Sequence, residues 1–365
     1  MRIVIFGLTV SSSWGNGHAT LWRGLLKALA RRGHAVTFFE RDTDYYRDNR
    51  DLHALPGGEL VLYRDWPSVA PQAARAIAAA DVALVTSYCP DAPDAERAVL
   101  DAPRALRVFY DLDTPVTLAA LDTPGAARPA YVGPEGFAGY DLVLSYTGGP
   151  ALEALRTRLG AGRVEPLYGH VDPELHRPVA REARFAADLS YLGTYAADRQ
   201  AALEALFIAP ARERPGSRFL IGGAQYPADF PWTDNIFFVR HLPPPDHPAF
   251  FSSGRLTLNV TRRAMAAMGW CPSGRLFEAA ACGVPILTDA WAGLDAFFAP
   301  GSELIVARGT AEALAAVDLS DAELRRIGEA GRARVLAEHT SDHRAADFEA
   351  AVEGAAAACG RPGGI

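Results

Sequence analysis

The sequence predicts an α/β protein built from two doubly wound, Rossmann-like parallel-sheet domains that face a cleft. At 365 residues the chain is too long for one ordinary hydrophobic core and suits two domains. Short apolar runs alternate with helical patterns throughout, which is typical of parallel sheets covered by helices on both faces. A proline-punctuated segment, residues 164–178, separates two such series and is expected to be the crossing between the domains.

The first series begins at the N-terminus. Its expected strands are Ile3–Phe6, Ala35–Phe39, Leu60–Tyr63, Val82–Val85, Ala105–Tyr110 and Leu142–Tyr146. Its expected helices are Ala19–Arg32, Pro71–Ala80, Ala92–Leu100, Thr114–Leu121 and Pro150–Leu159. Ligands of such sheets gather at the carboxyl ends of the strands, so the loops that follow the strands are where function is expected.

The second series follows the crossing. Its expected strands are Leu189–Leu192, Phe219–Ile221, Ile236–Val239, Leu256–Val260, Val284–Thr288 and Leu304–Val306. Its expected helices are Asp198–Ala211, Pro248–Phe251, Ser273–Cys282, Leu294–Phe298, Ala311–Ala316, Asp321–Glu338 and Asp342–Ala358. We therefore expect an N-terminal domain over residues 1–170 and a C-terminal domain over residues 171–340. Residues 341–365 are expected to form a helix that can cross back to the first domain, followed by a disordered tail.

Composition excludes several classes of protein. A hydrophobic content of 49% with 22% charged residues is that of a soluble globular protein, and a net charge of −7 argues against nucleic-acid binding. The four cysteines lie far apart, as expected for small buried side chains in a reducing compartment. No apolar stretch approaches the ~18 residues of a membrane span, and the N-terminus does not resemble a signal peptide. We expect a cytoplasmic protein.

The loop after the first strand, residues 8–18, ends in a histidine at a helix start. It is not a GxGxxG loop, which argues against a nicotinamide-dependent oxidoreductase. His18 either caps or packs that helix, or acts as a general base.

Asp111 and Asp113 follow the fifth strand and are either helix caps or partners of His18. We expect the first strand and the later central strands to be neighbours, which would bring one of these acids to His18. A carboxylate that holds one imidazole nitrogen leaves the other free to accept a proton, so His18 and Asp113 are the candidate catalytic pair. Asp-Leu-Asp also matches a short metal-binding pattern, but further oxygen ligands cannot be identified, and no metal site is expected.

Residues 269–289 read as a loop, a short helix, a glycine stop and a buried strand. Arg275 lies in the first turn of that helix, where the helix dipole prefers anions, and Glu278 shares its face. The pair is either a surface ion pair of little energetic value, or a ligand site in which Arg275 and the helix N-terminus hold a phosphate and Glu278 takes sugar hydroxyls. We favour the ligand site.

Further polar residues follow other strands of the second series. Arg199, Arg262 and Arg275 are expected to converge at one face and to suit a diphosphate, and the segment at Leu242 could offer backbone groups to a base. The residues expected to hold this ligand are Gly193, Thr194, Tyr195, Arg199, Leu242, Asn259, Thr261, Arg262, Ser273, Gly274, Arg275 and Glu278.

With these motifs the sequence resembles the GT-B glycosyltransferases over nearly its whole length. The resemblance rests on the two wound domains, the hinge Gly169–Pro178 and the run Phe277–Pro285. Within that fold it is most similar to the CgeB-like (spore-maturation-like) bacterial branch. The matching segments are Asn259–Arg262, Pro272–Glu278 and Trp291–Asp295.

The resemblance implies a nucleotide-sugar donor held by the C-terminal domain without an obligatory metal. Glu278 matches the glutamate that binds ribose hydroxyls, and Ser273 and Arg275 match positions near the diphosphate. Retaining relatives carry E-x7-E here, but Trp270 occupies the first glutamate position. His18 and Asp113 are similar in placement to the base dyad of inverting enzymes, so inversion is favoured.

We therefore expect a hexosyltransferase-type enzyme that moves a sugar from a UDP-, GDP- or dTDP-sugar to a hydroxyl of a small-molecule or glycan acceptor, with no cofactor. Two alternatives remain: a nucleotide-sugar epimerase on the same fold, and a non-catalytic nucleotide-sugar-binding protein, which Trp270 motivates. The acceptor, the sugar, the base and the oligomeric state are left open.

Overall fold

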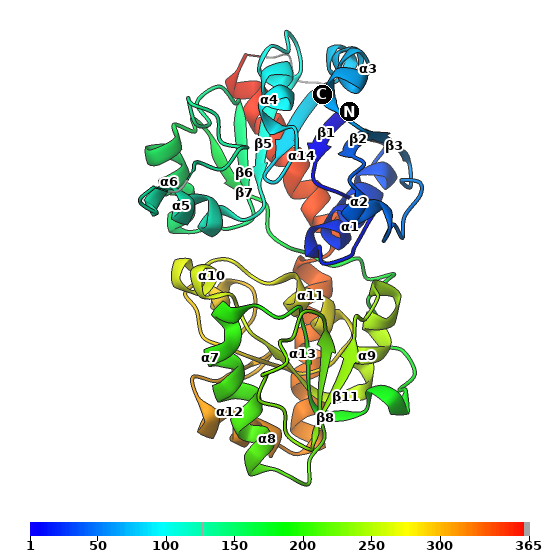
Figure 1. The fold of residues 1–365 in the computed structure, drawn as a ribbon, viewed down its shortest axis with the longest axis vertical. Helices are drawn as coiled ribbons and strands as arrows, with labels where there is room; N and C mark the ends of the chain where they lie inside the picture. Colours follow the sequence, from blue (N-terminus) through cyan, green and yellow to red (C-terminus); the bar gives the residue numbers. More distant parts are fainter. Residues whose placement is uncertain (126, 361–365) are drawn as a thin grey trace. The chain divides into compact units, whose positions relative to one another are not determined.

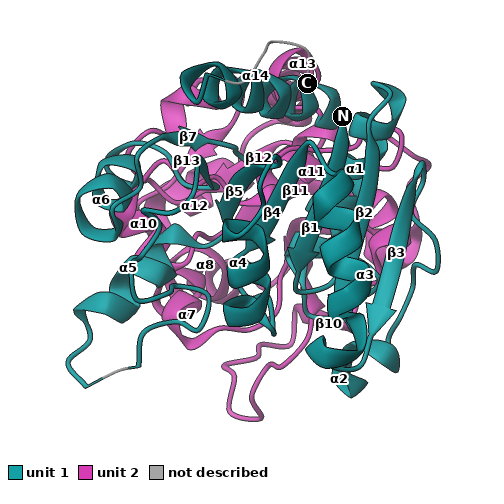
Figure 2. Cartoon of the chain, turned by 90° about the horizontal axis from the view of Figure 1, so that it is seen from above, with its two compact units in different colours: residues 1–168, 341–365 teal, residues 169–340 magenta. Residues whose placement is uncertain are grey.

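The structure, a computed structural model, describes residues 1–125 and 127–360, and the part of the predicted disordered tail beyond residue 360 lies outside them. The chain divides into two compact units, which Figure 2 colours separately. Unit 1 comprises residues 1–168 together with the C-terminal segment from residue 341, and unit 2 comprises residues 169–340.

Unit 1 is built on a parallel sheet with the strand order β3-β2-β1-β4-β5-β6-β7 (Figure 1). Its strands are β1 (Arg2–Gly7), β2 (Ala35–Arg41), β3 (Gly58–Tyr63), β4 (Val82–Thr86), β5 (Leu106–Asp111), β6 (Leu142–Ser145) and β7 (Val164–Pro166). Its helices are α1 (Gly17–Arg31), α2 (Asp44–Arg47), α3 (Trp66–Ala79), α4 (Ala92–Leu100), α5 (Thr114–Asp122), α6 (Pro150–Leu159) and α14 (Ser341–Ala358).

Helices cover both faces of this sheet. Trp22 of α1 and Phe348 of α14 belong to one buried cluster with strand residues such as Val108. Ile77 of α3 and Leu155 of α6 belong to the cluster on the other face. The strands carry near-continuous apolar runs because both faces are covered, and burying each large apolar side chain contributes roughly 1.5–3 kcal/mol.

Unit 2 is built on a second parallel sheet with the strand order β10-β9-β8-β11-β12-β13. Its strands are β8 (Ala187–Leu192), β9 (Phe219–Gly223), β10 (Ile236–Arg240), β11 (Gly254–Asn259), β12 (Ile286–Thr288) and β13 (Ile305–Val306). Its α-helices are α7 (Gln200–Leu203), α8 (Ala209–Glu213), α9 (His247–Ser253), α10 (Arg263–Met268), α11 (Gly274–Ala281), α12 (Thr310–Val317) and α13 (Asp321–Glu338). The predicted architecture of two parallel-sheet α/β domains is confirmed.

Several helix boundaries differ from those predicted. The helix expected at Pro71–Ala80 begins at Trp66, because the Asp65 carboxylate accepts a hydrogen bond from the Ser68 amide at 3.0 Å and caps the helix there. The expected Asp198–Ala211 helix is broken into short α-, 3₁₀- and π-helical pieces, with the π-helix at Glu204–Ile208.

Other differences lie in short elements. The expected helix Leu294–Phe298 is a 3₁₀ turn over Leu294–Ala296 that starts at Gly293 in the left-handed conformation. Strand β7 and helices α2 and α10 were not predicted, because they are only three to six residues long and have little periodicity. None of the four cysteines forms a disulfide, and Cys359 is exposed rather than buried. Among the described residues no helix is long and apolar enough to cross a membrane.

Candidate functional site

The carboxyl edge of the unit 2 sheet contains a topological switch point. Strand β8 lies between β9 and β11, so the connections leaving β8 and β11 run to opposite sides. Crevices at such points are where open parallel sheets bind ligands. The loop after β8 carries Gly193 and Thr194, and the loop after β11 carries Thr261 and Arg262.

Arg275, in the first turn of α11, reaches back to this switch point. Its Nη1 donates to Asn259 Oδ1 at 3.1 Å, and its guanidinium lies 5.2 Å from the ring centroid of Tyr191. Among the described residues no carboxylate forms an ion pair with it. Burial lowers the pKa of Arg275, and the positive charge of Arg199 lowers it further. A guanidinium nevertheless stays charged in proteins, so Arg275 is a partly buried cation without an acidic partner.

Gly193 has no side chain, and this leaves room for the Arg275 guanidinium. A Cβ at position 193 would lie 2.8 Å from the Tyr191 hydroxyl and 3.0 Å from Arg275 Nη2. The amides of Gly193 and Tyr195 already donate to Gly222 and Ala224 carbonyl oxygens, both at 2.8 Å. These two N–H groups are therefore engaged, so Gly193 and Tyr195, which were predicted to hold the ligand, do not offer their amides to a phosphate.

Arg199 lies on the same side of the loop. Its Nη1 donates to Thr194 O at 3.2 Å, and its Nε is buried without a hydrogen-bond partner. The Tyr226 hydroxyl donates to Gly193 O at 3.1 Å. Burial raises the pKa of Tyr226, and the positive charges of Arg275 and Arg199 both oppose that rise. Arg199 and Arg275, two of the three predicted arginines, are therefore close enough to influence the same groups electrostatically.

Arg262 differs from the other two arginines. Its Nε donates to Asp198 Oδ2 at 3.2 Å, and its side chain is 43% exposed. Its charge is balanced by this acid, which distinguishes Arg262 from Arg199 and Arg275. The ion pair instead joins the loop after β11 to the loop after β8.

Asn259 and Thr261 hold the loop after β11 in place. Asn259 is buried and its amide donates to Thr288 Oγ1 at 3.0 Å. The amide and the hydroxyl of Thr261 both donate to Asp289 Oδ1 at 3.0 Å. Burial raises the pKa of Asp289, whereas these hydrogen bonds lower it. Sequence reasoning missed Asp289 and Tyr191, although Asp289 directly follows a strand at the carboxyl edge.

The start of α11 faces this region without a side-chain cap. Ser273 takes the N-cap position with φ −65° and ψ 138°, but its hydroxyl makes no capping hydrogen bond, and Gly274 is the first helical residue. Trp270, upstream of it, has a φ of 51°, and a Cβ on Gly293 would lie 2.4 Å from its ring. The indole therefore packs flat over Gly293.

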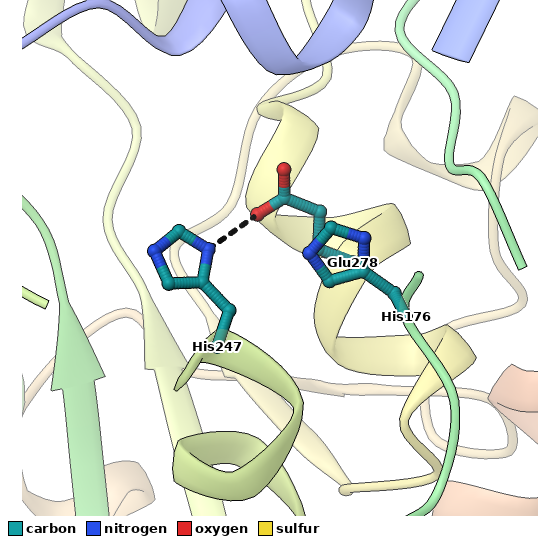
Figure 3. A group of neighbouring side chains, drawn as sticks. All are labelled: His176, His247 and Glu278. Atoms are coloured by element: carbon teal, nitrogen blue, oxygen red, sulfur yellow. Dashed lines mark ion pairs between the residues drawn. The ribbon is translucent and has the colours of Figure 1, made fainter. Parts of the chain in front are cut away.

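Glu278 lies one turn further along α11, between two histidines (Figure 3). His247 Nδ1 lies 3.9 Å from Glu278 Oε2, and one ring nitrogen of His176 completes a group whose atoms all lie within 4.8 Å of one another. Burial lowers the pKa of each histidine to about 4. His247 Nε2 lies 3.2 Å from Leu242 O, so the Leu242 carbonyl expected to meet a base is engaged.

In unit 1, His18 and Asp113 lie near each other but do not form a direct hydrogen bond. His18 Nε2 is 3.9 Å from Asp113 Oδ2. Strand β1 pairs with the later strand β4, as expected, and β4 separates it from β5, the strand that precedes Asp113. Tyr88, which follows β4, contacts both residues. Its hydroxyl donates to Asp113 Oδ2 at 2.9 Å, and its ring stacks on that of His18 with the ring centroids 6.1 Å apart. Tyr88 has a φ of 65°, a conformation rare for a bulky residue.

Asp111 lies beneath this group rather than beside His18. Its Oδ1 accepts hydrogen bonds from the Thr117 hydroxyl at 3.0 Å and the Asp113 amide at 3.3 Å, whereas its Oδ2 is buried without a partner. Burial raises the pKa of Asp111 and the nearby charge of Asp113 adds to the rise, whereas the Thr117 hydrogen bond opposes it, and the resulting pKa is about 7. In the described part of the chain Asp111 and Asp113 belong to no metal-ligand group.

The loop that ends at His18 is folded around a buried acid. Glu40 accepts hydrogen bonds from the hydroxyls of Thr9 and Ser11 and from the amides of Val10 and Ser11. The Asn16 side chain caps α1 by accepting from the His18 amide at 3.1 Å. The hydroxyls of the loop are thus structural, and the cap fixes the backbone from which His18 projects.

Comparisons with known proteins agree with this fold. Residues 199–350 match a family described as glycosyl transferase-like. No curated protein matches the chain. Among solved structures the chain is similar to sucrose-phosphate synthase from Thermosynechococcus elongatus, with 17% identity and a TM-score of 0.70 over 98% of this chain and 100% of that one.

Two further structures were solved with nucleotides. The Anabaena protein HepE in complex with UDP and glucose has 12% identity and a TM-score of 0.66, covering 97% of this chain and 100% of that one. An α-glucosyltransferase in complex with UDP-glucose and DNA has 11% identity and a TM-score of 0.68, covering 96% of this chain and 99% of that one. The chain therefore has the GT-B fold, and the family match over residues 199–350 agrees with the prediction of a glycosyltransferase.

Proposed function

We propose that the chain transfers a sugar from a nucleoside-diphosphate sugar to an acceptor hydroxyl. The observation that carries the proposal is Arg275, a partly buried cation at the uncapped start of α11 that forms no ion pair with any described residue. A diphosphate would supply the missing negative charge, because a helix N-terminus and a guanidinium both favour phosphate oxygens. Arg199 would contact the same group through its buried Nε.

In the proposed reaction, the acceptor O–H bond breaks and its proton passes to His18. The acceptor oxygen forms a bond to the anomeric carbon while the bond from that carbon to the phosphate oxygen breaks. The nucleoside diphosphate leaves with the electron pair, and Arg275 and Arg199 neutralise its charge. Because His18 Nε2 faces Asp113, Nδ1 is the nitrogen left to accept the proton.

Three parts of the proposal go beyond the fold. Inversion is supported by His18 beside Asp113 and by Trp270 at the position where retaining relatives keep a glutamate. The proposal needs no metal ion at the diphosphate, since two arginines and a helix terminus supply positive charge, and it needs no cofactor. Glu278 would accept hydrogen bonds from ribose hydroxyls, and the matching segments around it support membership of the CgeB-like bacterial branch.

The donor and acceptor are proposed by class. The nucleotides bound by the HepE and α-glucosyltransferase structures make UDP-glucose the first donor to test, ahead of GDP- and dTDP-sugars. The net charge of −7 favours a small-molecule or glycan acceptor over DNA. The absence of disulfides among four cysteines supports a cytoplasmic location. The comparisons do not favour the epimerase alternative.

Arg275→Ala tests the proposal directly. We expect this substitution to lower kcat/KM for sugar transfer by at least roughly 10²–10³-fold, the usual effect of removing one group that stabilises developing charge. Arg308→Ala is the matched control, because Arg308 is an exposed arginine of the same unit. Near-normal turnover by Arg275→Ala would contradict the diphosphate assignment. Binding of a donor by the wild-type chain without turnover of any acceptor or water would favour the non-catalytic alternative.

A further inference from the structure

Two histidines and a glutamate in unit 2 form a group that the sugar-transfer chemistry does not use as a whole. His176 comes from the segment that enters unit 2, His247 from the start of α9 and Glu278 from α11. Figure 3 shows the two imidazoles on either side of the Glu278 carboxylate. One ligand atom from each lies within 4.8 Å of the others.

The hydrogen bonds around His247 leave two acceptors facing each other. Its Nε2 lies 3.2 Å from Leu242 O, and a carbonyl can only accept, so Nε2 carries the proton in this contact. In the neutral ring Nδ1 then presents a lone pair, and it faces Glu278 Oε2 across 3.9 Å, a gap too long for a hydrogen bond. A cation, which accepts electron pairs, could bind between His247 Nδ1 and Glu278 Oε2.

His176 gives a second, independent indication. His176 is 1% exposed, and within the part of the chain that the structure describes neither of its ring nitrogens has a hydrogen-bond partner. Buried polar atoms in folded proteins are usually satisfied, so an imidazole with two unsatisfied nitrogens beside a carboxylate requires an explanation. A bound cation satisfies such a nitrogen in the way that water or a carbonyl would elsewhere.

We propose that His176, His247 and Glu278 bind a divalent zinc ion. Two imidazole nitrogens and one carboxylate oxygen are a common zinc ligand set, and the backbone carbonyl behind His247 is the second partner that zinc-binding histidines usually have. Zinc–ligand distances of about 2.0–2.2 Å mean that zinc binding would draw the three ligand atoms together by roughly 1 Å. The ion would tie together the entry segment of unit 2, α9 and α11.

Metal binding by the full chain tests this inference without a sugar donor. Both proposals use Glu278: zinc would take Oε2, which faces His247, and the ribose hydroxyls would take Oε1. A chain that transfers sugar but binds no zinc would refute only the present inference. Equilibrium dialysis against Zn²⁺, with metal content read by mass spectrometry, should give about one tightly held ion per chain. His176→Ala and His247→Ala should each weaken binding by at least roughly tenfold, since losing even an outer partner costs ~10–100-fold. His53→Ala and Cys359→Ser, which alter exposed residues, should bind as the wild type does.

X-ray absorption of the zinc-loaded wild-type chain decides the question even if a histidine variant fails to fold. The inference predicts scattering from two imidazole rings and no zinc–sulfur distance near about 2.3 Å. Zinc should also raise the melting temperature of the wild-type chain by mass action. Failure of the wild-type chain to bind zinc at micromolar concentrations, equal binding by folded His176→Ala and His247→Ala variants, or a zinc–sulfur shell would overturn it.

Discussion

The two units share one strand order around their central strands but carry opposite chemistry at the carboxyl edges of their sheets. In unit 1, the group consists of His18, Tyr88 and Asp113, with Asp111 beneath it. In unit 2, the corresponding edge carries Arg275, with Arg199 close enough to lower its pKa. One edge places carboxylates beside a histidine, whereas the other places Arg275 near Arg199, and among the described residues neither arginine forms an ion pair.

This difference teaches that the wound sheet determines where a ligand can bind, and the side chains in the loops determine which ligand binds there. A cationic edge suits a phosphate, and a histidine beside carboxylates suits proton removal from a hydroxyl. Sugar transfer requires both functions, which is why the comparison supports a transferase. The predictions below separate the two edges.

The largest effect is expected at the edge of unit 1. His18→Ala should lower kcat for sugar transfer by roughly 10²–10⁴-fold, because the acceptor hydroxyl loses its general base. Donor affinity should stay unchanged, since the proposed donor residues all belong to unit 2. Steady-state kinetics with varied donor would measure both quantities, with His53→Ala as the control histidine. Full activity of His18→Ala across the pH range would refute the base assignment.

A smaller effect is expected from Gly193→Ala at the edge of unit 2. The new Cβ would approach the Tyr191 hydroxyl and Arg275 Nη2 within 3.0 Å, so the guanidinium must move. We expect donor affinity to fall by roughly 10–100-fold, the cost of one charged hydrogen bond, while kcat at saturating donor changes little. Gly216→Ala is the matched control, since a Cβ there meets nothing within 4 Å. Unchanged donor affinity in Gly193→Ala would show that Arg275 does not need its present position.

Tyr88→Phe should have a more modest effect. It removes the hydroxyl that donates to Asp113 Oδ2 at 2.9 Å and leaves the ring that stacks on His18. We expect kcat to fall about tenfold, because Asp113 loses one charged hydrogen bond and is held less firmly. Tyr45→Phe, at an exposed tyrosine, provides the control. A kcat equal to that of the wild type would exclude Tyr88 from positioning Asp113.

The smallest effect concerns stability rather than activity. Burial raises the folded-state pKa of Asp111 from 3.8 to about 7, so the folded chain keeps this proton when the unfolded chain has lost it. The stability contribution of Asp111 is therefore fully present below about pH 4 and is lost as the pH rises through 7. Urea unfolding should show that Asp111→Asn, which cannot ionise, is less sensitive to pH over this range than the wild type. Equal pH dependence of the two chains would contradict the raised pKa.

The fold could be predicted because it rests on periodicity that the sequence displays directly. The apolar runs that become β1, β4, β8 and β11 are short, continuous and separated by helical patterns. The helix boundaries were harder to predict, since a single hydrogen bond, from the Ser68 amide to the Asp65 carboxylate, decides where α3 begins.

The sequence predicted which residue types the candidate site contains, but it did not predict the hydrogen-bond and ion-pair partners of those residues. Arg275 stood out because it opposes the helix dipole, and no acid among residues 1–125 and 127–360 forms an ion pair with it. Arg262 looked equivalent in the sequence, but its pairing with Asp198 depends on how two loops meet. Tyr88 was missed as the link between His18 and Asp113, because the position of β4 between β1 and β5 is a property of the sheet. The grouping of His176, His247 and Glu278 joins three distant segments and left no spacing signal.

The central claim is that the nucleotide binds at the cationic edge of unit 2 and not at the edge of unit 1. Isothermal titration of UDP and UDP-glucose into the wild-type chain, Arg275→Ala and His18→Ala tests it most directly. We predict that Arg275→Ala binds the nucleotide at least roughly tenfold more weakly than the wild type, since it loses a charged contact, and that His18→Ala binds it equally well. Wild-type affinity in Arg275→Ala, or a loss of affinity in His18→Ala alone, would contradict the account.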